Sequence, residues 1–375
     1  MLSDKRSGRG RALVGIGDVN DIGLWGGHPH FFLQAGRRNG LFAAGVVIHR
    51  ERLRARRLLW NALRPLILER PRGFQYSRSY RYRAWAQRSE PSDIGEYVSH
   101  FPLLPPADVV QEPVTYYLDA TLHQNFEEMA RRVPRRVQIE ALACEREAYL
   151  ASRFVVCWSR WCADDVRSFY GIPPDKVVII PPGAGLDEDV VPDPLPWDGS
   201  FAPLRLGIIG SDWKRKGGSL LLDVATALQS RGQPVEVIAI GPPPASLPDH
   251  PALRPVGFID KSRECHRFVD LVRSFHFGCL LSSDEPFGVS NLECIRLGVP
   301  VIGTTVGGIP ETVPPGAGLL FSPEQAGDEI AHVLETVLDS PDAYARMRQA
   351  ARDAAASQTW DRTADAFLAL LRDER

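Results

Sequence analysis

Residues 277–311 read FGCLLSSDEPFGVSNLECIRLGVPVIGTTVGGIPE, and this stretch decides the fold. An apolar run over 277–283 precedes a helical pattern that ends at Gly298, and a second apolar run follows over 299–305. Short apolar runs separated by a helix-length segment predict parallel strands of a doubly wound sheet. Glu285 then follows a strand and Glu293 lies in the first turns of the next helix, at the sheet edge where ligands bind.

The same alternation extends in both directions along the chain. In the second half, apolar runs over 205–210, 235–241 and 318–321 are separated by helical patterns. In the first half, further runs are predicted as strands over 12–19, 41–49, 96–104, 114–120 and 153–159. Prolines and glycines crowd between Pro181 and Pro203, which predicts a linker between two domains.

The predicted architecture is therefore two doubly wound, Rossmann-like parallel-sheet domains that face a central cleft, with C-terminal helices. We expect an N-terminal, acceptor-side domain over 1–190 and a C-terminal, nucleotide-sugar-binding domain over 191–355. The segment 356–375 is predicted as a helix that crosses back to the first domain.

Composition is typical of a globular enzyme: 375 residues, 44% hydrophobic and 24% charged. Six cysteines without a CxxC pair favour reduced thiols, and no apolar run is long enough to span a membrane. We therefore expect a soluble protein of the cytoplasm.

The net charge of −2 hides an asymmetry between the two ends of the chain. Residues 1–100 hold 18 Lys and Arg against 8 Asp and Glu, which leaves 26 against 38 for the rest, so the balances are +10 and −12. Much of the excess lies in the basic region 50–88, which fits a solvated basic face, a phosphorylated acceptor, or a peripheral contact with anionic lipid at the inner face of the membrane. No nucleic-acid-binding motif accompanies it, so nucleic acid is not expected as a partner.

Each glutamate alone has a structural explanation. Ser290 and Glu293 match the S-x-x-E capping box, so Glu293 could close its own helix, and Glu285 could be an exposed loop residue.

A second loop changes that balance. The stretch 210–218, GSDWKRKGG, joins the first strand of this half to its first helix. Lys216, with Arg215 before it and the flexible Gly217 after it, suits a diphosphate at a helix N-terminus. An ordinary solvated turn is the alternative. The loop lacks GxxxxGK[ST] and GxGxxG, so a P-loop kinase and a nicotinamide dehydrogenase lose support.

With a third loop, GGIPE at 307–311, on the same predicted edge, the chain resembles glycosyltransferase family 4 of the retaining GT-B enzymes. The E-x7-E motif of that family is matched by Glu285 and Glu293, and the order KG, E-x-FG, E-x7-E and GG-x-PE agrees over about 153–325. The resemblance implies that Lys216 neutralises the donor diphosphate, Glu285 contacts the transferred sugar and Glu293 binds the ribose hydroxyls. Many relatives have an Arg where Ser211 or Asp212 stands here, so that cationic role either moves to Lys214 or Arg215 or is missing from this chain.

The resemblance also implies contacts through main-chain segments of the second domain. The backbone of Phe287, Gly288 and Val289 would approach the sugar and phosphates, while Phe258 and Ile259 would lie against the nucleobase. Cations and helix N-termini would stabilise the leaving diphosphate, so no cofactor and no metal is expected.

The N-terminal half carries weaker candidates. Gly26 and Gly27, after the first strand, would allow close approach of a diphosphate or sugar. His28 and His30 lack a third ligand at metal-binding spacing. Asp119 and His123 follow a predicted strand where relatives often place a polar residue that faces the reacting sugar; a capping aspartate and a surface histidine are the alternatives.

The sequence thus predicts a retaining, metal-independent glycosyltransferase for polysaccharide or glycoconjugate biosynthesis. It would move a sugar from a nucleotide-sugar donor to a glycan, lipid-linked or small-molecule acceptor, with attack on the same face as departure. The alternatives are another GT-B enzyme, such as a phosphorylase or an epimerase, and a catalytically inactive binding module.

Overall fold

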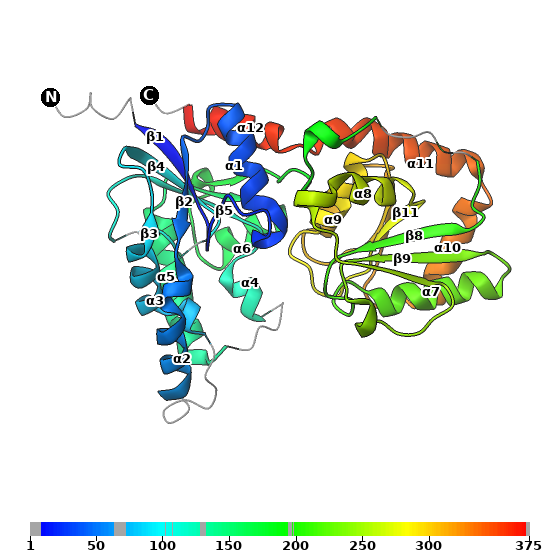
Figure 1. The fold of residues 1–375 in the computed structure, drawn as a ribbon, viewed down its shortest axis with the longest axis horizontal. Coiled ribbons are helices and arrows are strands. Elements are labelled where there is room, and N and C mark those ends of the chain that lie inside the picture. Colours follow the sequence, from blue (N-terminus) through cyan, green and yellow to red (C-terminus); the bar gives the residue numbers. More distant parts are fainter. Residues whose placement is uncertain are drawn as a thin grey trace. The chain divides into compact units, whose positions relative to one another are not determined.

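The computed structural model describes residues 9–63, 73–101, 103–106, 108–127, 133–193, 197 and 199–372. The chain divides into two compact units, Met1–Pro181 with Thr363–Arg375, and Pro182–Arg362. Part of the basic region singled out above, residues 64–72, lies outside the described residues. The prediction of two doubly wound parallel-sheet domains is confirmed (Figure 1).

The first unit is built on a seven-stranded sheet of order β3-β2-β1-β4-β5-β6-β7. All neighbours pair in parallel except β3, which lies antiparallel to β2 at the edge. The strands are β1 (Gly10–Val14), β2 (Ala44–Ile48), β3 (Arg88–Ser89), β4 (Ile94–Ser99), β5 (Val114–Leu118), β6 (Phe154–Cys157) and β7 (Val177–Ile179).

Helices cover both faces of this sheet because its central strands are apolar on both sides. In β5, whose five residues are all buried, Tyr116 packs against Tyr149 while its neighbour Tyr117 packs against Phe32 and Phe367. The helices of this unit are α1 (His28–Arg38), α2 (Arg54–Leu63), α3 (Arg78–Ala86), α4 (Leu122–Glu127), α5 (Arg135–Ala151) and α6 (Arg160–Ser168).

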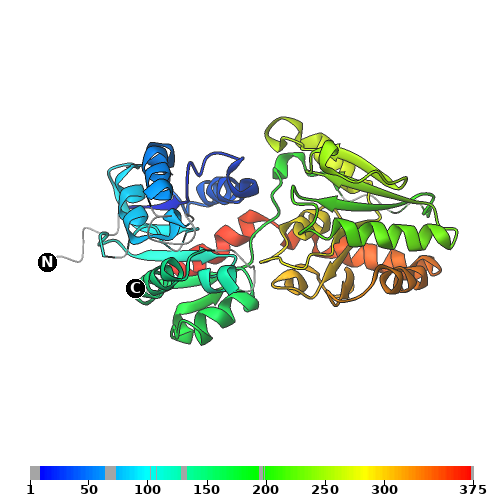
Figure 2. The same ribbon diagram turned by 90° about the horizontal axis from the view of Figure 1, so that it is seen from below.

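The second unit has a six-stranded, fully parallel sheet of order β10-β9-β8-β11-β12-β13. Its helix α7 lies on one face and α8 on the other (Figure 2). The strands are β8 (Leu204–Ile209), β9 (Val235–Ile240), β10 (Leu253–Gly257), β11 (Phe277–Leu280), β12 (Val301–Thr304) and β13 (Gly318–Phe321). The helices are α7 (Gly218–Ser230), α8 (Lys261–Arg273), α9 (Val289–Arg296), α10 (Gly327–Leu338) and α11 (Pro341–Ala354).

The strand order reverses between β8 and β11, which are neighbours in space although β9 and β10 separate them in sequence. Their carboxyl ends therefore form the topological switch point of the sheet, where the loops diverge and leave room for a ligand. The loop after β8 is 210–217 and the loop after β11 is 281–288.

The last helix, α12 (Trp360–Arg372), begins in the second unit and ends in the first. Its final turn is held by two partly buried arginines. Arg11 and Arg153 both donate to the carbonyl oxygen of Leu371, at 3.4 and 3.3 Å. The same arginines pair with Glu96, so the negative end of the helix lies beside two cations.

Contacts place the division between the units at Pro181 and Pro182 instead of after residue 190. The segment after Pro182 packs within the second unit, where Glu188 pairs with Arg296 and the carbonyl of Gly185 accepts from Lys261. The second crossing lies at Thr363, within α12, where the prediction had the returning segment begin at residue 356.

Candidate functional site

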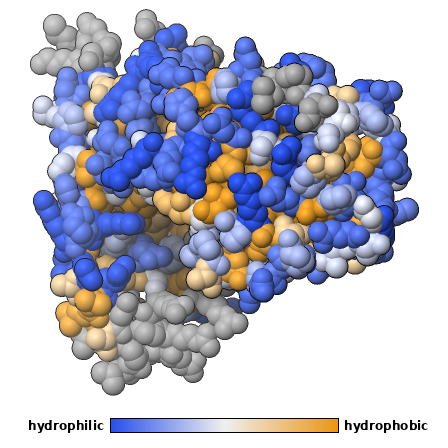
Figure 3. Space-filling view, turned by 45° about the vertical axis from the view of Figure 1, so that its right-hand side comes forward, coloured by the Kyte–Doolittle hydropathy of each residue, from blue (hydrophilic) through white to orange (hydrophobic). Residues whose placement is uncertain are grey.

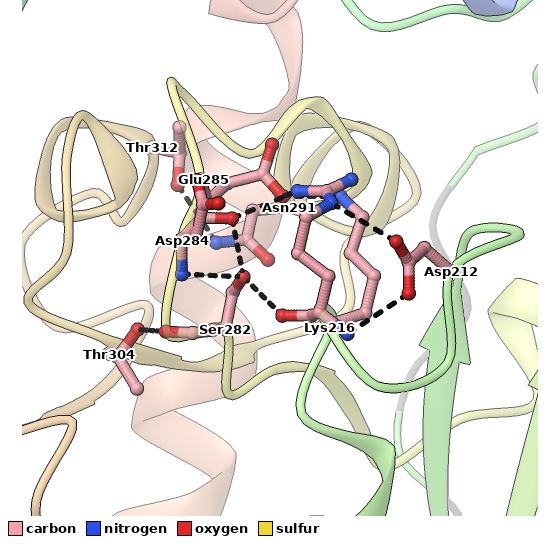
Figure 4. Close-up of polar contacts among 9 residues, drawn as sticks. Asp212, Lys216, Ser282, Asp284, Glu285, Asn291, Thr304 and Thr312 are labelled. Atoms are coloured by element: carbon pink, nitrogen blue, oxygen red, sulfur yellow. Dashed lines mark hydrogen bonds and ion pairs between the residues drawn. The ribbon is translucent and has the colours of Figure 1, made fainter. Parts of the chain in front are cut away.

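The switch point of the second sheet brings a glutamate and two cations together. Glu285, in the loop after β11, is only 8% exposed. Its Oε2 accepts from Lys216 Nζ at 2.6 Å and from Arg215 Nη1 at 2.7 Å (Figure 4). The two positive charges offset the cost of burying the Glu285 carboxylate, and Arg215 Nε also lies 3.8 Å from Asp212 Oδ2.

Two adjoining loops fix this geometry. The Ser282 hydroxyl donates to the carbonyls of Arg215 and Asp284, at 2.5 and 2.9 Å, and Arg215 Nη1 also reaches the Asp284 carbonyl at 3.0 Å. Thr304, at the end of β12, donates to the Ser282 carbonyl at 2.6 Å. The loops after β8, β11 and β12 are therefore tied together by side-chain to backbone bonds.

Glycine is required where these loops touch. Gly217 has φ +81°, and a Cβ there would lie 2.0 Å from the carbonyl oxygen of Leu281. Gly307 has φ +55°, and its Cβ would lie 2.0 Å from the carbonyl oxygen of Glu285. Both contacts are far inside van der Waals distance, so the close approach of the three loops depends on these glycines.

Glu293 lies in α9 and is 4% exposed. The capping-box explanation for Glu293 is wrong, because α9 begins after Gly288, so that Ser290 lies inside the helix, and Glu293 is ion-paired with Lys261. Lys261 opens α8, also donates to the Gly185 carbonyl at 3.1 Å, and lies over the Phe268 ring. Lys261 was not among the residues predicted from the sequence, although it lies only two positions after Ile259, the last residue assigned to the nucleobase.

That stretch follows β10 at the same edge of the sheet. Phe258 is 77% exposed, the highest value among the large hydrophobic residues described, whereas Ile259 is 4% exposed and belongs to the core. A bare aromatic ring at a loop tip is suited to stacking against a planar ring. Of the remaining predicted residues, Phe287 is buried, Gly288 has φ +96° and precedes α9, and Val289 starts that helix.

The candidates in the first unit lie at the carboxyl edge of its own sheet. Gly26 and Gly27, with φ +64° and +91°, end the turn that leads into α1. Trp25 beside them has φ +49°, which is uncommon for a residue other than glycine, and its ring meets the edge of His100. Asp119 accepts from the Ala120 amide at 2.8 Å, an arrangement that fits local turn formation.

His123 is the more developed of the two polar candidates after β5. Its Nδ1 lies 2.8 Å from Asp165 Oδ1, and its ring stacks on Phe169 with centroids 3.5 Å apart. Its backbone amide donates to the Tyr170 hydroxyl at 3.1 Å. Asp165 and Phe169 were not among the residues predicted from the sequence; they come from α6 and the residue after it, about 40 positions further along the chain.

Below this turn lies a buried carboxyl group. Glu145 of α5 accepts from the Leu122 amide and from the hydroxyls of Tyr149 and Tyr170. Burial raises the pKa of Glu145 to about 8. The hydrogen bonds favour the ionised form and oppose this rise, but the effect of burial is larger. Glu145 thereby holds the first turn of α4, the helix that carries His123.

The described residues contain no group of three or more His, Cys, Asp or Glu arranged to hold a metal ion. Among those same residues, no helix is both long and apolar enough to cross a bilayer.

Two parallel-sheet units with charged loops at a switch point are the architecture of the GT-B glycosyltransferases. Residues 205–354 match the family model "Glycosyl transferases group 1", and residues 48–188 match the model "Glycosyltransferase Family 4". The chain belongs to glycosyltransferase family 4 and has the GT-B fold.

Curated relatives agree with this assignment. A D-inositol 3-phosphate glycosyltransferase of Gordonia bronchialis is 30% identical over 234 residues, 55% of this chain and 49% of that protein. A probable transglycosylase of Burkholderia thailandensis is 28% identical over 211 residues, 54% of this chain and 55% of that one. The chain thus spans about half the length of the curated relatives it matches.

Solved structures support the fold over nearly the whole chain. Sucrose-phosphate synthase of Thermosynechococcus elongatus superimposes with a TM-score of 0.66 at 15% identity, covering 97% of this chain and 98% of that one. HepE of Anabaena in complex with UDP-glucose gives a TM-score of 0.61 at 16% identity, covering 96% and 99%.

Proposed function

We propose that the chain transfers a sugar from a nucleotide-sugar donor to a hydroxyl group of an acceptor, with retention of anomeric configuration. The observation that carries this proposal is the cluster of Lys216, Arg215 and Glu285 at the switch point of the second sheet. Cations at that place suit the diphosphate of a donor, and the neighbouring structure of HepE holds UDP-glucose.

The ion pairs suggest how donor binding proceeds. A diphosphate would compete with Glu285 for Lys216 and Arg215, because both prefer the more highly charged anion. Glu285 would then be released to accept hydrogen bonds from hydroxyls of the transferred sugar. Glu293, held by Lys261 through one oxygen, would offer the other to the ribose, and Phe258 would stack on the base.

Catalysis would be electrostatic and positional. Lys216 and Arg215 would stabilise the negative charge that develops on the leaving diphosphate, without a metal cofactor. Asp119 and His123 are proposed to face the reacting sugar, and the Gly26-Gly27 turn to allow close approach of the diphosphate or the sugar.

The test is a donor screen by mass spectrometry on the wild-type chain and on Lys216→Ala and Glu285→Gln. An inositol phosphate is a natural first acceptor, given the curated relatives. Removal of a charge-stabilising donor should lower kcat about 10²- to 10³-fold. Arg267→Ala, which removes an exposed cation of α8, is the control and should retain activity. Equal turnover by wild type and both site variants would refute the proposal, as would turnover that stops when EDTA is added.

We further propose a peripheral contact with anionic lipid through α2. Leu58 and Leu59 are 59% and 58% exposed, and on a helix of 3.6 residues per turn Arg54 and Arg56 flank their stripe on either side. Figure 3 shows a hydrophobic patch among hydrophilic residues at the lower end of the first unit, where α2 lies. An apolar stripe bordered by arginines suits a helix lying in the headgroup region of a leaflet.

Vesicle flotation tests this contact. The chain should float with vesicles rich in phosphatidylglycerol and much less with phosphatidylcholine alone, and Leu58→Ser with Leu59→Ser should abolish flotation. The solvated-face alternative predicts that neither vesicle recruits the chain at any salt concentration.

A further inference from the structure

The side chain of His123 is held by a carboxylate that itself has a fixed partner. Asp165 lies on α6 with its side chain only 10% exposed, and its Oδ1 is 2.8 Å from His123 Nδ1. Its other oxygen, Oδ2, accepts from the Thr121 hydroxyl at 2.5 Å. The two oxygens of Asp165 thus face two residues at the start of α4, Thr121 and His123.

The direction of the Thr121 hydroxyl is set by a third group. Thr121 Oγ1 accepts from the backbone amide of Gln124 at 3.1 Å, while the side-chain oxygen Gln124 Oε1 accepts from the backbone amide of Thr121 at 3.1 Å. This reciprocal pair is a capping box at the start of α4. Because Thr121 Oγ1 accepts from the backbone amide of Gln124, the Thr121 hydroxyl hydrogen points to Asp165. Oδ2 of Asp165 is therefore the acceptor in that hydrogen bond.

An ionised carboxylate can only accept, so the proton between Asp165 and His123 belongs to His123 Nδ1. Neutral imidazole carries one N–H, and the second nitrogen, Nε2, is then left with its lone pair. The ring is held by its stack on Phe169, and the Tyr170 hydroxyl holds the main chain of His123 by accepting from its backbone amide. The His123 side chain remains 26% exposed, so the ring is not sealed in the core.

We infer that Asp165 is a positioning residue that fixes the Nδ1–H tautomer of His123 and presents Nε2 as an acceptor for a substrate hydroxyl. The identity of that hydroxyl rests on the proposed function. The tautomer of His123 rests on the hydrogen-bond geometry alone. No covalent step is assigned to the pair.

The decisive variant is Asp165→Asn. Thr121 still donates its hydroxyl hydrogen, so the amide oxygen of Asn takes the place of Oδ2 and the NH2 group faces His123 Nδ1. Two donors cannot face each other, so the histidine should change to the Nε2–H tautomer. Asp164→Asn removes the same charge from the same helix at an exposed position, where the Asp164 carboxylate lies 3.5 Å from Arg167, and it serves as the control.

The readout is the long-range proton–nitrogen correlation spectrum of the full-length chain labelled with ¹⁵N-histidine, recorded with the histidines neutral. The His123 signals are assigned by their loss in His123→Gln. Wild type and Asp164→Asn should show an Nδ1–H ring, and Asp165→Asn an Nε2–H ring. An Nε2–H ring in wild type, or an unchanged tautomer in a folded Asp165→Asn chain, would overturn the inference.

Activity separates this inference from the proposed function. With a donor found in the screen, Asp165→Asn should lower kcat at least 10-fold with little change in the donor KM, because binding in the second unit is intact. A tautomer change with undiminished kcat overturns the positioning role. If wild type transfers no sugar from any donor, the proposed function fails, whereas an Nδ1–H ring that changes in Asp165→Asn still supports the orientation by Asp165.

Discussion

Replacing Glu145 by glutamine should change how the stability of the first unit depends on pH. The carboxyl group is fully buried and its pKa lies near 8, against an ordinary value of 4.5, because burial disfavours the charged form. Between these values the folded chain keeps the proton that the unfolded chain loses. The stability contribution is therefore complete below pH 4.5 and is lost as the pH rises toward 8.

The structure sets the size of the effect. A rise from 4.5 to about 8 is about 3.5 pH units, and at ~1.36 kcal/mol per unit this gives an upper limit of about 5 kcal/mol. Such a change is a large part of the ~5–15 kcal/mol that stabilises a typical domain. Glutamine fills the same space, can accept from the Leu122 amide and carries no charge at any pH.

Equilibrium urea unfolding at pH 5, 6.5 and 8 measures the effect in wild type and Glu145→Gln. The two proteins should have similar free energies of unfolding at pH 5, whereas at pH 8 the wild type should be less stable than the variant by several kcal/mol. Glu147→Gln, an exposed change on the same helix, should follow the wild type. Parallel stability curves for wild type and Glu145→Gln across this range would refute the reasoning.

Three further changes test the second unit. Gly217→Ala should cost several kcal/mol of stability because its Cβ meets a backbone carbonyl oxygen, whereas Gly232→Ala, with a similar φ of +93° and open space, should cost only about 1 kcal/mol in thermal unfolding. Phe258→Ala should weaken UDP binding in calorimetry by about 1–3 kcal/mol, with the melting temperature unchanged and affinity retained in Phe258→Tyr. Lys261→Met leaves a buried carboxylate unpaired and should cost about 3–5 kcal/mol; the loss should shrink when Glu293→Gln is added, and two additive losses would contradict the pairing.

Most of the strands could be predicted from sequence because buried parallel strands are continuous apolar runs. The strands over Phe277–Leu280 and Val301–Thr304 are of this kind, with every residue buried. The strands that escaped prediction are short edge strands. Leu253–Gly257 carries an arginine and a proline, both of them exposed, and Val177–Ile179 is only three residues long and lies just before the segment predicted as the linker.

The site could be predicted only where its residues share a motif. Lys216 and Glu285 follow adjacent strands at the switch point, so strand order alone brings their loops together. Lys261 and Asp165 reach their partners through packing between helices and loops remote in sequence, and no local pattern reports such contacts. The raised pKa of Glu145 could not be predicted from the sequence either, because it depends on how completely the core excludes water.

The return of α12 to the first unit has a consequence for biosynthesis. A ribosome completes the residues up to Pro181 early. The first unit also needs Thr363–Arg372, which supply the packing of Phe367 and the hydrogen bonds to the Leu371 carbonyl, and these residues emerge only after the whole second unit has been made. The earlier-synthesised unit is therefore the later one to finish folding. During that interval the face that receives Phe367 is exposed, and this nascent intermediate is where we expect chaperone binding.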